Sequence, residues 1–211
     1  MGQRLPKHQR DFDLFLQHIK DGHNFSFVRF SDGEMEILQN NSLELGEKGV
    51  SWSRGDSSFV YPEYDRKKFD PVVHKHIRYE LIASLIFNKP DYWVGVPSAN
   101  SKNSHYLSLI EILSEQRIGT RPTATYSDLL INDNYLRFVK EMVPALSSKR
   151  SVTYVGNYRA DIKLLNKNWN QINIGDGIFD DWDESKNHVL SEIEKLDSGC
   201  ILLCSASSLT N

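Results

Sequence analysis

Residues 25–34 read FSFVRFSDGE and change from a strand-like to a helix-like pattern within one short segment. The first six residues alternate in character, which predicts a β-strand that ends at Phe30. Ser31 then precedes two acidic residues, a pattern typical of a helix N-terminus. The segment therefore predicts a strand over 25–30, a tight turn, and a helix that begins at Ser31 or Asp32 and runs through Leu38.

Outward from this segment, short apolar runs alternate about six times with segments of helical period. Such alternation predicts parallel strands joined by right-handed crossovers, with helices on both faces of the sheet. We therefore expect a single α/β domain over residues 1–211 with a doubly wound, mainly parallel sheet. Besides 25–30, the predicted strands are 92–96, 123–126, 151–155, 171–174 and 200–204.

Helical spacing is clearest between Tyr135 and Leu146, whereas residues 40–70 show no clear period. We predict a long loop over 40–70, and a loop of that length in a compact domain usually serves a function. Its aromatic and charged residues would suit stacking on a nucleobase or sugar and pairing with phosphate, or ordinary packing at a sheet edge. These residues are Trp52, Arg54, Asp56, Tyr61 and Tyr64.

The composition is that of an ordinary globular chain. Its 211 residues suit one sizeable domain, with 39% hydrophobic and 25% charged residues. The formal net charge of −3 argues against the broad basic surface that nucleic-acid binding needs. No apolar run reaches the roughly 18 residues of a membrane-spanning helix, and the polar N-terminus lacks the apolar core of a signal peptide. We therefore expect a cytoplasmic location, no nucleic-acid partner and no membrane span.

The turns after the predicted strands are the places to seek a ligand site, because ligands of parallel sheets bind outside the carboxyl ends of the strands. The most specific motif among these turns is Ser31-Asp32-Gly33-Glu34, which presents two carboxylates on either side of a glycine. Such oxygen ligands suit Mg²⁺ and Mn²⁺, which often bridge a carboxylate to a substrate phosphate. Gly33 leaves room for a phosphate, and burial of Arg29 in the strand would require an anionic partner.

The same turn also fits a purely structural role. Ser31 and Glu34 have the spacing of a capping box, in which the Glu side chain bonds back to the backbone of the capping Ser. The residues alone leave both interpretations open. Among the other turns, Asn100, Asn157 and Arg159 are polar residues that follow predicted strands. The acidic segment from Asp176 to Asp183 is predicted to be a turn and a helix N-terminus, or to hold an acceptor-activating base.

Residues 27–34, FVRFSDGE, resemble the N-terminal signature of the GT-D type glycosyltransferases, which typically reads Arg-Phe-Gly-Asp-Gly-Glu. Residues 92–97 and 155–159 are more loosely similar to later segments of that family. The chain differs from the signature at Ser31, where the family has Gly. The resemblance implies a Rossmann-like fold, nucleotide-sugar donors and a role in metal-assisted donor binding for the family's Asp-x-Glu motif, here Asp32-Gly33-Glu34.

We therefore expect a glycosyltransferase that moves a sugar from a nucleoside diphosphate sugar to a hydroxyl acceptor on a glycan or a protein. Asp32 and Glu34 would be the catalytic residues and would hold Mn²⁺ or Mg²⁺, which would stabilise charge on the departing diphosphate. The predicted donor contacts are Arg29, Gly33, Asn100, Asn157 and Arg159. The sequence leaves two alternatives open, a metal-dependent phosphohydrolase that uses the same carboxylates and a non-catalytic nucleotide-sugar-binding module.

The chain ends at Asn211, shortly after the apolar run from Cys200 to Cys204. Because five consecutive residues of this run are apolar, we predict an interior or near-interior strand that is covered on both faces. We expect that cover to come from a helix beyond a truncated C-terminus, or from another subunit of a homo-oligomer.

Overall fold

The computed structural model describes residues 7–46, 49–50, 67–97, 108–109, 112, 123–149 and 151–205. The chain divides into two compact units, unit 1 with residues 1–35, 83–149 and 211, and unit 2 with residues 36–82 and 150–210. Both units contain parallel strands and helices, so the predicted α/β class is confirmed. In the described residues the parallel strands form two three-stranded sheets. The single doubly wound sheet and the single domain therefore stay predictions.

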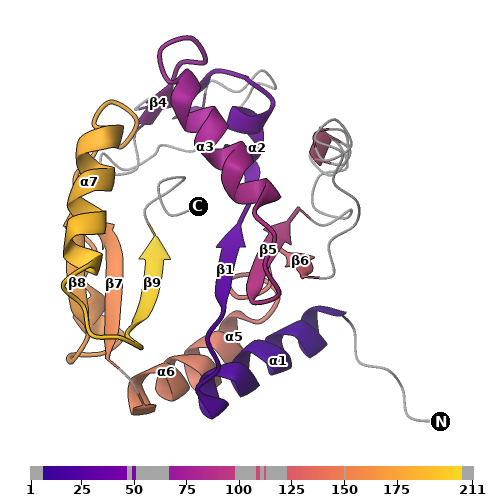
Figure 1. Ribbon diagram of the computed structural model, residues 1–211, viewed down its shortest axis with the longest axis vertical. Coiled ribbons are helices and arrows are strands. Elements are labelled where there is room, and N and C mark those ends of the chain that lie inside the picture. The colour runs from indigo at the N-terminus through magenta and orange to yellow at the C-terminus, as the bar shows by residue number, and fades with distance from the viewer. Residues whose placement is uncertain are drawn as a thin grey trace. The chain divides into compact units, whose positions relative to one another are not determined.

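Unit 1 is built on a parallel sheet with the strand order β1-β5-β6 (Figure 1). Its strands are β1 (Ser26–Arg29), β5 (Tyr92–Val96) and β6 (Ala124–Tyr126), all three of which were predicted. Arg29 pairs with Gly95, and Gly95 pairs with Thr125. Since paired residues of parallel strands point to the same side, these three residues lie in one row on one face of the sheet.

Helix α1 (Lys7–Asp21) packs against this sheet through its apolar stripe. The buried residues of the stripe are Phe12, Phe15, Leu16 and Ile19. The ring of Phe15 lies 5.0, 5.3 and 5.2 Å, between centroids, from the rings of Phe25, Phe27 and Trp93. This aromatic cluster joins α1 to β1 and β5, because Phe27 and Trp93 are paired neighbours on those two strands.

Gly95 leaves no room for a side chain in the middle strand of this sheet. A Cβ atom there would lie 2.8 Å from a ring carbon of Phe27 and 3.0 Å from the Cα atom of Ser127. Because backbone cannot move aside as a side-chain tip can, Gly95→Ala should lower the free energy of unfolding by about 1–3 kcal/mol. Denaturant unfolding followed by circular dichroism measures this loss. Gly175→Ala is the control, since a Cβ there meets no atom of the described residues within 4 Å, and an equal loss in both variants would contradict the prediction.

The helix predicted between Tyr135 and Leu146 is interrupted by a π-helical turn. Its parts are α5 (Tyr135–Arg137), η2 (Phe138–Met142) and α6 (Val143–Lys149). The N–H of Val143 bonds to the carbonyl of Phe138, five residues earlier, and Pro144 has no N–H with which to restore the α-helical pattern. The wider turn shifts the apolar stripe, so that only part of it is buried. Met142, Val143 and Leu146 are buried, whereas Tyr135 and Val139 are exposed.

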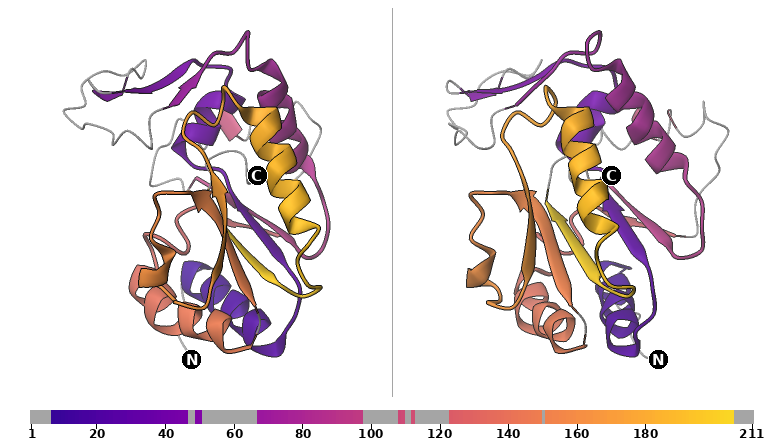
Figure 2. Two further views of the ribbon diagram at one scale, coloured as in Figure 1. Left: turned by 90° about the vertical axis from the view of Figure 1, so that its left-hand side faces the viewer. Right: turned by 60° about the vertical axis from the view of Figure 1, so that its left-hand side comes forward.

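Unit 2 contains a second parallel sheet, with the strand order β8-β7-β9. Its strands are β7 (Val152–Asn157), β8 (Asn170–Ile174) and β9 (Ile201–Ser205), again as predicted. A short 3-10 helix, η3 (Ile162–Leu164), lies between β7 and β8 in the chain, and α7 (Trp182–Ile193) packs beside β8 (Figure 2). Strand β9 lies at the edge of this sheet and three of its five residues are exposed. The cover on both faces that the apolar run predicted is therefore not seen within this sheet.

The segment predicted as a loop over residues 40–70 contains three short strands. Strand β2 (Leu43–Gly46) pairs antiparallel with both β3 (Gly49–Val50) and β4 (Lys67–Phe69). Leu43 and Leu45 are buried and flank the exposed Glu44, an alternation too short to be recognised in a charged stretch. The loop prediction is wrong at these residues. The aromatic and charged group from Trp52 to Tyr64 lies outside the described residues.

Two helices contain the points at which the chain passes from one unit to the other. They are α2 (Asp32–Leu38) and α3 (Lys75–Ile86). Helix α2 was predicted to begin at Ser31 or Asp32 and to run through Leu38, and it begins at Asp32. No helix in the described part of the chain is long and apolar enough to cross a membrane.

Candidate functional site

The Asp32-Gly33-Glu34 segment forms the first turn of α2, directly after β1. A carboxylate oxygen of Glu34, Oε2, accepts a hydrogen bond from the backbone N–H of Ser31 at 3.0 Å. This contact is the Glu half of a capping box, so Glu34 has a structural role. It leaves a metal-binding role open, because a carboxylate offers about four lone-pair sites on its two oxygens.

The side chains of this turn are partly open to solvent. Asp32 and Glu34 are each half-buried, and within the described part of the chain a Cβ atom built on Gly33 meets no atom within 4 Å. The described residues hold no group of three or more His, Cys, Asp or Glu that could bind a metal ion. Any metal here would therefore have at most two carboxylates from that part of the chain. This donor set fits Mg²⁺, which usually binds one or two carboxylates together with waters and substrate phosphates.

Arg29 is anchored across the sheet of unit 1. Its Nε atom donates a hydrogen bond to the carbonyl of Ser127, which follows β6, at 2.6 Å. Strand β5 lies between β1 and β6, and the residue paired with Arg29 on β5 is Gly95. Because Gly95 has no side chain, the arginine can cross the middle strand without a clash. This partner is a neutral carbonyl, so the anionic partner that the sequence predicted for Arg29 stays a prediction.

A second polar cluster lies at the carboxyl ends of β7 and β8 in unit 2. It contains Asn157 and Arg159, both predicted donor contacts, and Asp176, which follows β8. Nδ2 of Asn157 donates to Oδ1 of Asp176 at 2.7 Å, and a guanidinium nitrogen of Arg159 lies 2.9 Å from Oδ2. Oδ1 of Asn157 accepts from the backbone N–H of Arg159 at 2.9 Å. The side chains of the three residues and the backbone N–H of Arg159 therefore form a closed ring of polar contacts.

Sequence reasoning placed Asp176 in a turn but did not assign it to this cluster. The signal that would have found it is topological. Strands β7 and β8 are parallel neighbours, and Asn157 pairs with Ile174, so the residues after both strands meet at one edge of the sheet. Tyr158 completes the cluster, since its hydroxyl accepts a hydrogen bond from Nε of Arg159 at 2.8 Å.

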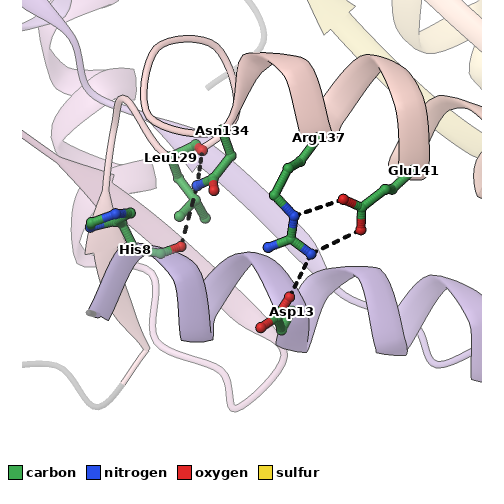
Figure 3. A network of polar contacts seen from close by, with 6 residues as sticks. All are labelled: His8, Asp13, Leu129, Asn134, Arg137 and Glu141. Atoms are coloured by element: carbon green, nitrogen blue, oxygen red, sulfur yellow. Dashed lines mark hydrogen bonds and ion pairs between the residues drawn. The ribbon is translucent and has the colours of Figure 1, made fainter. Parts of the chain in front are cut away.

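Other charged residues of unit 1 are engaged in holding helices together (Figure 3). Arg137 donates to the two carboxylate oxygens of Glu141 at 2.8 and 2.9 Å and to Asp13 on α1 at 2.8 Å. The hydrogen bonds between Arg137 and Glu141 raise the pKa of the guanidinium and lower the pKa of the carboxyl. Buried Asn134 donates to two backbone carbonyls beside them. These contacts give the group a structural role.

In unit 2, His74 is 7% exposed and its ring lies beside the rings of Phe69 and Phe179, which also contact each other. Its Nδ1 accepts a hydrogen bond from the backbone N–H of Asp70 at 2.9 Å, and its Nε2 lies 3.8 Å from a carboxylate oxygen of Asp180. The N–H groups of Val73 and Val72 bond to the Asp70 carboxylate and lower its pKa. Asp180 belongs to the segment that was considered for an acceptor-activating base, but this arrangement identifies no such base.

The predicted site residues thus fall into two groups. Arg29, Asp32, Gly33 and Glu34 lie around the β1–α2 turn of unit 1, and Asn157 and Arg159 lie together in unit 2. Asn100 lies outside the described residues. Comparison of the chain with protein-family models, curated protein sequences and solved structures found no match.

Proposed function

We propose that this protein is a metal-dependent glycosyltransferase that moves a sugar from a nucleoside diphosphate sugar to a hydroxyl of a glycan or protein. The observation that carries the proposal is the turn between β1 and α2. It presents Asp32 and Glu34 on either side of Gly33, where no atom of the described residues lies within 4 Å of a Cβ position, after the strand that carries Arg29. The similarity of residues 27–34 to the GT-D signature supports it. We extend the proposal to a Rossmann-like arrangement of the parallel strands, a cytoplasmic location and a homo-oligomer.

In this proposal Asp32 and Glu34 hold Mn²⁺ or Mg²⁺, which when bound supplies Lewis-acid stabilisation of the leaving diphosphate. Glu34 also fixes the start of α2 through the N–H of Ser31, so that the capping contact orients the carboxylate. The hydrogen bond to Ser127 restrains the Arg29 guanidinium, whose positive charge then favours an anionic donor. Asn100, Asn157 and Arg159 remain proposed donor contacts.

A nucleotide-sugar binding screen by thermal shift, with and without Mn²⁺, tests this function. We expect at least one nucleoside diphosphate sugar to raise the unfolding temperature, and to do so far more with Mn²⁺ than with a chelator, because ligand binding to the folded state stabilises it. Absence of any shift over the panel would contradict the proposal. Release of free monophosphate without acceptor would favour the phosphohydrolase instead. Tight donor binding without turnover over a broad acceptor panel would favour the binding module.

A further inference from the structure

His18 and His23 lie side by side in unit 1, between the last turn of α1 and the start of β1. Their Nδ1 atoms are 3.2 Å apart and their ring centroids are 5.4 Å apart. His18 is half-buried, with its ring centroid 5.7 Å from that of Phe25, and His23 is exposed. Solvent therefore reaches both imidazoles, while the contact with Phe25 restrains one of them.

The backbone at the end of α1 brings these two side chains together. The N–H of Gly22 bonds to the carbonyl of Ile19 at 3.3 Å, and the N–H of His23 bonds to the carbonyl of His18 at 2.9 Å. With the φ of 77° at Gly22, these bonds form the Schellman motif of a helix C-terminus. In that motif the residue after the glycine commonly contacts the residue five positions before it, and here both residues are histidines. Their proximity is therefore set by the helix end itself.

The separation of the two Nδ1 atoms suits a single transition-metal ion. Bonds from zinc to imidazole are about 2.0–2.1 Å long, so nitrogens 3.2 Å apart define an angle of about 100° at the metal, close to tetrahedral. Imidazole suits zinc, copper and nickel, whereas carboxylates such as Asp32 and Glu34 suit magnesium and manganese. The negative end of the α1 dipole also favours a cation at this place. The same distance fits an N–H···N hydrogen bond between the rings, which would use the same two nitrogen atoms.

We propose that His18 and His23 bind a transition-metal ion of the zinc class through their Nδ1 atoms. The described part of the chain contributes no third His, Cys, Asp or Glu to such a group, so water completes the coordination. The site is distinct from the proposed site at Asp32 and Glu34, because His23 precedes β1 and Asp32 follows it. A bound ion links the end of α1 to the segment that leads into β1, and so stabilises the folded protein.

Titration calorimetry of the protein with Zn²⁺, in a buffer that does not coordinate the metal, tests the site. His18→Gln and His23→Gln should each weaken binding at least about 10-fold, because each removes one of the two protein ligands and even the loss of a residue that supports a ligand costs about 10–100-fold. His8→Gln, which changes another histidine of α1, is the matched control and should leave the affinity unchanged. Excess Mg²⁺ should not displace Zn²⁺, since it prefers oxygen ligands.

Nitrogen NMR of the histidine rings in the wild-type protein gives a second measurement that needs no variant to fold. An equimolar amount of Zn²⁺ should shift the Nδ1 resonances of His18 and His23 together. If the contact between the rings is a hydrogen bond alone, both resonances should stay unchanged, and this result would overturn the site. Zn²⁺ binding of wild-type strength in both His18→Gln and His23→Gln would overturn it as well. No nucleotide takes part in either experiment, so failure of this site leaves the proposed function standing.

Discussion

Replacing Asp32 by Asn should weaken Mn²⁺-dependent binding of a nucleoside diphosphate by at least about 10-fold, because a neutral amide is a poor ligand for a hard cation. Glu34→Gln should have the same effect on binding. The second variant separates the two roles of Glu34, since the oxygen of Gln can still accept the hydrogen bond from the N–H of Ser31. If capping were its only role, the variant would cost roughly 1 kcal/mol of stability or less and leave nucleotide affinity unchanged.

Titration calorimetry with Mn²⁺ present or replaced by a chelator measures this difference directly. The matched control is Glu36→Gln, on the same helix, where the carboxylate accepts a hydrogen bond from Nδ2 of Asn41 at 2.8 Å. That variant should bind the nucleotide as the wild type does. Unchanged metal-dependent affinity in both Asp32→Asn and Glu34→Gln would contradict the metal-binding role. Helix capping would then be the role that the structure supports for this turn.

The sequence predicted those helices and strands in which the local spacing of apolar residues matches the residues that are buried in the structure. Helix α1 ends at Asp21, and Gly22 directly after it adopts the left-handed conformation, with φ of 77°, that favours glycine at a helix C-terminus. The π-helical turn before Pro144 was missed because proline predicts a disturbed helix but not the direction in which the apolar stripe shifts. Strands β2 and β4 were missed because their stability depends on pairing between segments more than 20 residues apart in the chain, Leu43 with Phe69 for example.

The candidate site was predicted best where its residues are neighbours in the chain. Asp32 and Glu34 share one turn, so spacing alone brings them together. The contact between Arg29 and Ser127 joins residues 98 positions apart and depends on the absence of a side chain at Gly95. The contact between Asn157 and Asp176 joins residues 19 positions apart and depends on the register of β7 and β8. Neither register nor strand order can be deduced from the residues themselves.

The largest expected loss of stability is for Phe15→Ala. Phe15 is 1% exposed and contacts three other aromatic rings, so its removal leaves a large cavity between α1 and the β1-β5-β6 sheet. The free energy of unfolding should fall by about 3–5 kcal/mol, the usual cost of truncating a buried Phe. Leu14→Ala, one position away on the same helix and 37% exposed, is the control and should cost far less.

Tryptophan fluorescence can follow the unfolding of each unit in variants that keep either Trp93, which lies 5.2 Å from Phe15 in unit 1, or a tryptophan of unit 2 such as Trp169. We expect the Phe15→Ala variant to move the transition of Trp93 to lower denaturant concentration. If the two units unfold as one cooperative structure, the signals of unit 2 should move by the same amount, since a two-state transition gives one midpoint for every probe. Separate midpoints would identify unit 2 as independently stable. A loss in Phe15→Ala no larger than that in Leu14→Ala would contradict the packing of α1 on this sheet.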